Sequence, residues 1–140
     1  MTAPIPETKP IGVNFLQYYD FPQGAVVSDV FMAPYILWYA NRPTVASPYH
    51  RNVEGIMDNH EILMNPDMVK VAELLKKHQV GSIVLPLDID KKYYVSPEEN
   101  VDKLYGKMLS SHEYPAWLTE DVTAHPWNYV VLKVLREKLP

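Results

Sequence analysis

Short β-branched runs alternate along this chain with segments whose apolar residues recur at the spacing of an α-helix. The β-branched runs lie at 25–30, 44–47, 82–85 and 128–135, and the helical segments lie at 34–41, 66–78 and 101–109. Such alternation is typical of α/β domains, in which helices flank a mostly parallel sheet. The sequence therefore predicts a small three-layer, Rossmann-like α/β domain with about four mostly parallel strands, of which the last could run antiparallel.

Two helices and one strand have clear boundary signals. The run from Ser82 to Leu85 has almost no polar alternation, which predicts a central strand buried on both faces. The helix before it is predicted to begin at Asn65-Pro66-Asp67, with Asn65 as N-cap, and to end at Gly81. A capping box at 96–99 predicts the start of the helix whose apolar face runs from Val101 to Leu109.

The chain is expected to contain one domain behind a leader. Residues 1–23 are predicted to form an extended leader or linker, because Pro4, Pro6 and Pro10 disfavour regular structure near its start. Its aromatic part at 12–21 could be a short helix or a docking segment. Residues 24–140 are predicted to form a single α/β domain.

Composition excludes several classes of protein. The chain has 140 residues, no Cys and a formal charge of −4. A disulfide scaffold, a zinc ribbon and a thiol nucleophile are therefore excluded, and no nucleic-acid partner is expected because a basic face is lacking. The longest apolar run, Val30 to Ala40, is interrupted by Pro34 and is far shorter than the roughly 18 residues that span a bilayer. The chain as given is expected to be soluble.

Polar side chains are densest in the segment 49–61, which is predicted to be a loop after the second strand. In open α/β sheets ligands bind beyond the carboxyl ends of the strands. The end of the first predicted strand and this loop are expected at the same edge of the sheet. The predicted ligand-binding residues are Asp29, Tyr49, His50, Arg51, Asn52 and Glu54. Without a Gly-rich phosphate loop or a nucleophile elbow, no cofactor and no catalytic residue is assigned.

The chemistry of this loop stays open between functional and structural roles. His50 could exchange a proton with Asp29 or Glu54, or it could bond to the end of the neighbouring strand. Arg51 could clamp a carboxylate or phosphate, or pair internally with the same acids.

A metal site is a further alternative for this loop. Its ligands would be His50, Asp58 and His60, because imidazole and carboxylate groups together suit zinc or a similar ion. Their spacing matches no compact metal motif, and they could equally be ordinary polar loop residues.

Aromatic residues are frequent for a chain of this length, with ten Tyr and three Trp. Trp38 and Tyr39 lie on the first predicted helix, and Trp117 and Trp127 lie in or beside loops. Such side chains are common at protein interfaces and membrane surfaces, but they also fill the cores of small folds. Both interpretations remain open.

A family resemblance covers most of the chain. Between Gly24 and Leu85 a strand leads into a short helix, a PYHRN loop at 48–52, a helix and a strand, and a PAWL segment at 115–118 precedes the closing strand. This order resembles the soluble C-terminal domain that follows the membrane helices of certain bacterial polytopic proteins. Those proteins are similar to GT-C glycosyltransferases, which use lipid-linked sugars, and to oligosaccharyltransferases.

The resemblance implies an accessory extracytoplasmic (periplasmic) domain whose partner is the membrane-embedded part of its parent protein. Its binding loop would face a lipid-linked sugar or the acceptor, and the domain would have no catalysis of its own. Oligosaccharyltransferases read the acceptor peptide with a WWDYG motif, and the comparable place here reads Ser28-Asp29-Val30-Phe31 without the paired Trp. The alternative is a stand-alone α/β domain that binds a small anion, or is an enzyme, through the loop at 49–52.

Overall fold

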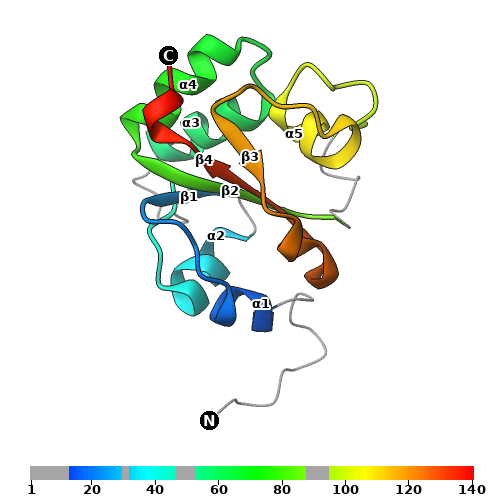
Figure 1. Cartoon of the computed structure of the whole chain (residues 1–140). Helices are drawn as coiled ribbons and strands as arrows, with labels where there is room; N and C mark the ends of the chain where they lie inside the picture. The colour runs from blue at the N-terminus through cyan, green and yellow to red at the C-terminus, as the bar shows by residue number, and fades with distance from the viewer. Residues whose placement is uncertain (1–12, 30–31, 47–52, 88–94) are drawn as a thin grey trace.

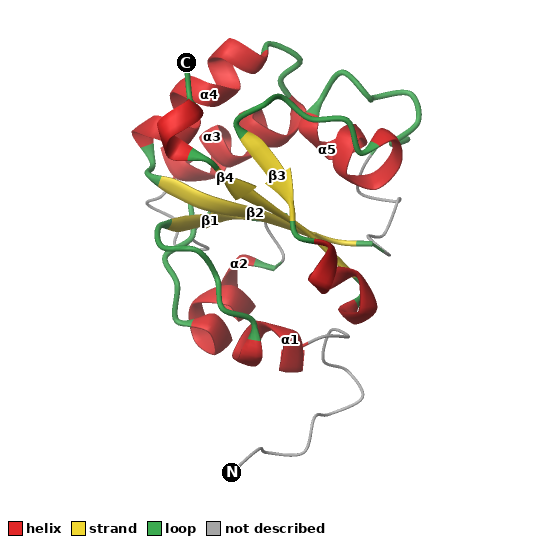
Figure 2. Cartoon of the chain, in the orientation of Figure 1, coloured by secondary structure: helices red, strands yellow, loops and turns green. Residues whose placement is uncertain are grey.

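A four-stranded sheet runs through the middle of the molecule, with helices on both of its faces (Figures 1 and 2). The structure is a computed structural model and describes residues 13–29, 32–46, 53–87 and 95–140. The strands, in the order in which they lie across the sheet, are β1 (Ala25–Val27), β2 (Val80–Pro86), β4 (Tyr129–Val134) and β3 (Leu118–Glu120). The predicted four-stranded α/β architecture is thus confirmed in outline.

The direction of the strands differs from the prediction. β1 and β2 are parallel, whereas β2 pairs with β4 and β4 pairs with β3 in antiparallel fashion. The sheet is therefore mixed and mostly antiparallel, so the prediction of a mostly parallel, Rossmann-like sheet is wrong in this respect, whereas the antiparallel last strand that it allowed is present. Residues 121–128, which join β3 to β4, are too few for a parallel crossover, which needs about a dozen residues or more.

The helices form two outer layers. On one face lie α3 (Val53–Met64), α4 (Met68–Lys77) and α5 (Leu104–Gly106), the last continued by the π-helical turn η2 (Lys107–Ser111). On the other face lie α1 (Val13–Tyr18), α2 (Ala33–Tyr35), the π-helical turn η1 (Ile36–Ala40) and the 3-10 helix η3 (Val122–Trp127). A second 3-10 turn, η4 (Arg136–Lys138), follows β4. The predicted three layers are present.

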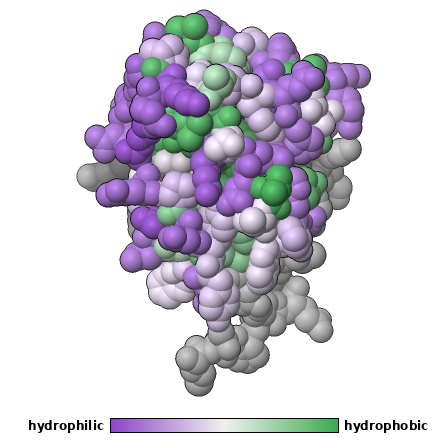
Figure 3. Space-filling view, in the orientation of Figure 1, coloured by the Kyte–Doolittle hydropathy of each residue, from purple (hydrophilic) through white to green (hydrophobic). Residues whose placement is uncertain are grey.

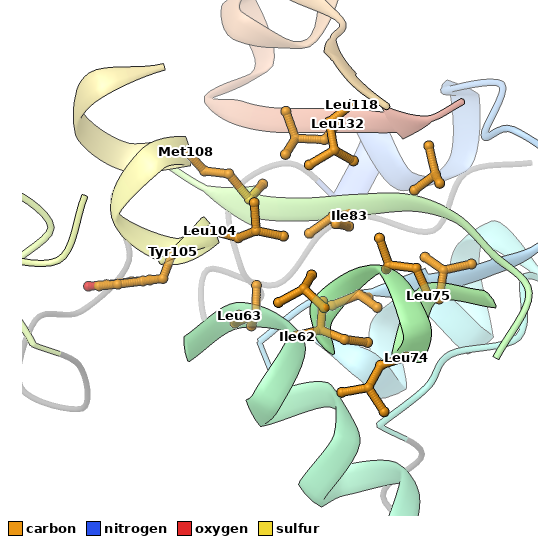
Figure 4. Packing of buried hydrophobic residues seen from close by; sticks show 14 of the residues in the cluster. Ile62, Leu63, Leu74, Leu75, Ile83, Leu104, Tyr105, Met108, Leu118 and Leu132 are labelled. Carbon is orange, nitrogen blue, oxygen red and sulfur yellow. The ribbon is translucent and has the colours of Figure 1, made fainter. Parts of the chain in front are cut away.

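Each face of the sheet has its own hydrophobic core. Under α3, α4 and α5 the core is mostly aliphatic, and Ile62, Leu75, Ile83, Leu104 and Leu132 point toward one another there (Figure 4). Alternate residues of the same strands face the other layer, as Ile83 and Val84 show by belonging to different cores. β2 is buried along almost its whole length, which confirms the predicted central strand.

The second core contains a group of stacked aromatic rings. Phe15 of α1 stacks on Tyr129 of β4 with ring centroids 4.7 Å apart, and on Tyr19 at 4.8 Å. Phe21 meets Tyr19 edge-on at 4.7 Å. Stacked and edge-on rings add to the stability that burial alone gives. The aromatic segment that begins with α1 is therefore packed against the sheet.

The helix α3 corrects the predicted loop over 49–61 from Val53 onward, and residues 49–52 of that prediction lie outside the described residues. Its buried face consists of Gly55, Asn59, Ile62 and Leu63, which recur at helical spacing. Two of these four residues are not apolar, so a search for apolar periodicity does not detect the face. Residues 53–64 are helical because this face packs on the sheet and on α4.

The boundaries of α4 differ from the prediction at both ends. Asp67, rather than Asn65, is the N-cap, and its Oδ1 accepts hydrogen bonds from the N–H groups of Val69 and Lys70. The left-handed residue after the helix is Gln79, with φ 51°, rather than a glycine. Gly81 instead lies in β2, where a Cβ atom would stand 2.2 Å from the carbonyl oxygen of Gln23.

Three further predictions were wrong in extent. The predicted strand at 44–47 makes only an isolated bridge, between Thr44 and Val26, and Ser47 lies outside the described residues. The helix expected from the capping box at 96–99 begins only at Leu104. β3 begins at Leu118, the last residue of the PAWL segment, where no strand was predicted.

No helix in the described residues is both long and apolar enough to cross a membrane.

Candidate functional site

Two of the six predicted ligand-binding residues, Asp29 and Glu54, lie within the described part of the chain. Tyr49, His50, Arg51 and Asn52 lie outside the described residues, so their role stays a prediction. Asp29 follows β1 and is buried, and Glu54 lies in the first turn of α3 with its side chain 74% exposed.

Asp29 belongs to a buried polar corner at the end of β1. Its Oδ1 accepts a 3.1 Å hydrogen bond from the N–H of Met32, just before α2. Asn59 of α3 donates from Nδ2 to the carbonyl oxygen of Ser28 at 2.7 Å. These bonds attach α2 and α3, which lie on opposite faces of the sheet, to the same strand end. In the described residues Asp29 therefore has a structural role, and its predicted contact with a ligand stays a prediction.

Glu54 and Asp58 both turn toward the end of α4. Lys77 pairs with Glu54, and its Nζ lies 2.8 Å from Asp58 Oδ2. The same Asp58 oxygen lies 2.7 Å from His78 Nε2. Partial burial would raise the pKa of Asp58, but the bonds from Lys77 and His78 outweigh it and hold that pKa below its ordinary value. This ion network fastens α3 to α4.

The described residues give no support to a metal site. Of the three predicted ligands, His50 lies outside the described residues, Asp58 is engaged by Lys77 and His78, and His60 is exposed. Within the described ranges no group of three His, Asp or Glu side chains could hold a metal ion.

The aromatic residues divide between the core and the surface. Trp117 is buried in the aliphatic core, whereas Trp38 is 82% exposed and Trp127 is 46% exposed. Tyr39 is partly buried, and its ring is parallel to that of Tyr35 at 6.5 Å. Core packing is thus confirmed for Trp117, and an exposed surface for Trp38 and Trp127.

A pocket of about 400 Å³ opens between α1, η3 and β4, a volume typical of small-molecule sites. Its aromatic lining comes from Phe15, Tyr18, Tyr19 and Trp127. In the space-filling view purple hydrophilic residues cover much of the upper part of the molecule, and pale residues of intermediate hydropathy are frequent in the lower part, where α1 lies (Figure 3). Besides these aromatic rings, polar side chains line the pocket.

The polar groups of the pocket are organised around Asp121, the N-cap of η3. Its Oδ2 accepts a 2.6 Å hydrogen bond from the Tyr19 hydroxyl, and its Oδ1 accepts one of 2.6 Å from the Thr123 hydroxyl. Lys133 Nζ lies 3.6 Å from Oδ2. Asp20 completes the polar lining.

These bonds set the protonation of both partners. The bonds from Thr123 and Tyr19, which outweigh burial, lower the pKa of Asp121 to about 2. Burial and the bond to Asp121 raise the pKa of Tyr19 well above its ordinary value. At neutral pH the pocket therefore holds a charged Asp121 and a neutral Tyr19.

Reasoning from the sequence did not find this pocket. Its residues lie at 15–20, 121–127 and 133, with no local motif to connect them. The aromatic density at 12–21 was the one signal present.

A second polar cluster surrounds Glu120 at the end of β3. The Tyr114 hydroxyl donates to Glu120 Oε1 at 2.6 Å, and His112 Nδ1 lies 2.8 Å from the same oxygen. His125 Nε2 is 3.2 Å from Oε2. Burial opposes the charge on Glu120, but the bonds from Tyr114 and His112 keep its pKa below the ordinary value. This cluster ties the segment after η2 to η3.

Comparisons with known proteins show a structural likeness. No protein-family model matches the chain, and no curated protein is significantly similar to it. The C-terminal globular domain of an oligosaccharyltransferase from Archaeoglobus fulgidus has a similar structure, with a TM-score of 0.63 and 12% sequence identity. The match covers 87% of this chain and 93% of that domain. At this identity the likeness shows the fold alone, so the predicted resemblance is confirmed at the level of the fold, with an archaeal neighbour in place of the expected bacterial ones.

Proposed function

We propose that this chain acts as an accessory, extracytoplasmic domain of a membrane-embedded glycosyltransferase-like protein of the GT-C class. The observation that carries the proposal is the structural likeness to a C-terminal globular domain of an oligosaccharyltransferase, which extends over nearly the whole of both chains. A likeness that leaves little of either chain unmatched favours the same kind of unit, a soluble domain attached to a larger enzyme. The domain itself carries no catalytic residues in this proposal.

The exposed aromatic side chains support a docking role for one face. Trp38 of η1, in the layer formed by α1, α2, η1 and η3, is 82% exposed. Trp and Tyr side chains combine an apolar ring with a polar group, so they suit a surface that lies between an apolar environment and water. In the proposal, this layer lies against the membrane-embedded part of the parent protein, and the opposite layer of α3, α4 and α5 faces water.

The loop at 49–52 is the proposed contact with the acceptor or the lipid-linked sugar. His50, Arg51 and Asn52 offer a proton carrier, a fixed cation and an amide in succession. Asp29 holds the carboxyl end of β1 to the start of α2, and ligands bind beyond the carboxyl ends of strands in α/β sheets.

Photo-cross-linking tests the docking face. A photoreactive amino acid replaces Trp38 in the protein as the source genome encodes it, with position 73 of α4, an exposed glutamate on the other layer, as the matched control. We expect position 38 to cross-link to a membrane-embedded segment, on the same or another polypeptide, and position 73 to give none. Cross-links to soluble proteins alone at both positions, with the protein absent from the membrane fraction, would contradict the proposal.

A transfer assay in the same strain tests the loop. His50→Ala and Arg51→Ala are expected to impair glycan transfer while membrane fractionation stays unchanged. His60→Ala, an exposed histidine on α3, serves as the control and should have no effect. Unchanged transfer in both loop variants would remove the loop from the proposed function.

A further inference from the structure

We propose that the pocket between α1, η3 and β4 binds a neutral saccharide. The described residues that line the pocket belong to other segments of the sequence than the predicted loop at 49–52. The proposal depends on the aromatic faces, the hydrogen-bonding groups and the balance of charge in the pocket, each of which points to a polyhydroxylated, uncharged ligand.

The aromatic faces provide a stacking surface. Tyr18 is 70% exposed and Trp127 is 46% exposed, although both line a concave pocket. Phe15 lies beneath them, fully buried, with its ring centroid 6.1 Å from that of Trp127. Trp127 is thus supported by the core from behind while part of its ring remains open. The C–H face of a pyranose ring is apolar and packs on such a surface.

The polar groups beside these rings can both donate and accept. Tyr19 gives its O–H to Asp121, so a lone pair of its oxygen remains available as an acceptor. The Thr123 hydroxyl donates to the same carboxylate, so its oxygen also remains available as an acceptor. Lys133 supplies N–H donors, and Asp20 supplies acceptors. Sugar hydroxyls, which donate and accept at once, match this mixed set.

The two carboxylates and one ammonium group of the pocket disfavour an anionic ligand, and the pairing of Lys133 with Asp121 reduces the attraction for a cation. Asp20 and Asp121 would repel an anion such as a sugar phosphate, and Lys133 would repel an ammonium ion. Asp121 is also engaged by Tyr19, Thr123 and Lys133, so it is not available to pair with a ligand cation. A neutral ligand avoids both repulsions.

Binding is measured on the full chain by isothermal titration calorimetry and saturation-transfer NMR. The probes are neutral mono- and disaccharides in the gluco, galacto, manno and N-acetylhexosamine configurations. Glucose 6-phosphate and glucosamine are the charged comparison ligands. Both keep the pyranose ring, and the first adds a negative charge whereas the second adds a positive one. We expect saturable binding of at least one neutral sugar, and weaker binding of both charged analogues.

Two substitutions locate the site. Trp127→Ala and Tyr18→Ala are each expected to weaken binding by about tenfold, equivalent to about 1.4 kcal/mol. Trp38→Ala, at an exposed tryptophan outside the pocket lining, should bind as the unaltered chain does. Tyr18 is so exposed that its removal leaves the fold intact, which keeps the test decisive if Trp127→Ala unfolds the protein.

Three results would overturn the proposal. They are no binding of any neutral sugar, tighter binding of a charged analogue, and binding that Tyr18→Ala leaves unchanged. None of them bears on the membrane-docking proposal, because that one is tested by cross-linking from Trp38 and by glycan transfer. The two proposals can therefore fail separately.

Discussion

The Tyr19 hydroxyl donates a 2.6 Å hydrogen bond to Asp121 Oδ2 and thereby joins the end of α1 to the start of η3, across 102 residues of sequence. Tyr19 also packs on Phe15 and Phe21, so the same residue belongs to the aromatic core and to the polar lining of the pocket. One side chain therefore couples the packing of the N-terminal helix to the shape of the candidate site.

Removal of this hydroxyl should destabilise the fold measurably. Tyr19→Phe keeps the ring and loses a bond to a charged acceptor, so we expect the free energy of unfolding to fall by about 1–2 kcal/mol. Urea unfolding followed by circular dichroism measures the change. Tyr18→Phe, at the neighbouring exposed tyrosine, is the control and should change little. Equal stability of the two variants would show that the Tyr19 bond contributes nothing.

The Asp121 carboxylate should make stability depend on pH in the acid range. Its pKa in the folded protein is about 2, below the ordinary value of 3.8. A lowered pKa means that the charged form stabilises the fold above about pH 4 and that this contribution is lost as the pH falls toward 2. Melting temperatures measured across this range should fall less steeply in Asp121→Asn than in the unaltered protein. Parallel curves would refute the role given to this carboxylate.

Glu54 and Asp58 should differ in importance although both pair with Lys77. Asp58 is mostly shielded from solvent and also bonds His78, whereas Glu54 is 74% exposed. We expect Asp58→Asn to cost about 1–2 kcal/mol of unfolding free energy and Glu54→Gln less than about 0.5 kcal/mol. Chemical denaturation of this matched pair measures both. A larger loss in Glu54→Gln would contradict the described network.

Gly81 should not tolerate any side chain. A Cβ atom there would lie 2.2 Å from the Gln23 carbonyl oxygen, so either β2 or the turn before β1 must move. We expect Gly81→Ala to lose at least about 3 kcal/mol or to fail to fold. Glu73→Ala, at an exposed position of α4, serves as the control for expression and should be nearly neutral. A normally stable Gly81→Ala would show that the approach of the two backbones is wrong.

Tyr114 and Glu120 should be energetically coupled. Their 2.6 Å bond joins a partly buried hydroxyl to a carboxylate. A double-mutant cycle of Tyr114→Phe and Glu120→Gln should give an interaction energy of about 1–2 kcal/mol. Additive effects of the two substitutions would exclude a direct contribution from this bond.

The sequence predicted best where a local pattern carried the whole signal. β2 and β4 are long apolar strands, and their positions follow from composition alone. α3 was missed because Gly55 and Asn59 form half of its buried face. The predicted end of α4 at Gly81 is wrong because Gln79 adopts the left-handed conformation that was expected of Gly81. Gly81 lies in β2 instead, where the close approach of Gln23 leaves no room for a side chain.

The sequence by itself thus determined an α/β domain, its central strand and the helix α4, because burial periodicity is encoded residue by residue. The pairing of β4 with both β2 and β3 was decided only in the folded molecule, since it depends on how segments far apart in the sequence pack together. The pocket also exists only in the folded molecule, because its lining comes from separate segments of the sequence. Tyr19 and Asp121 meet only because α1 and η3 pack on the same face of the sheet, and no local pattern in the sequence records that contact.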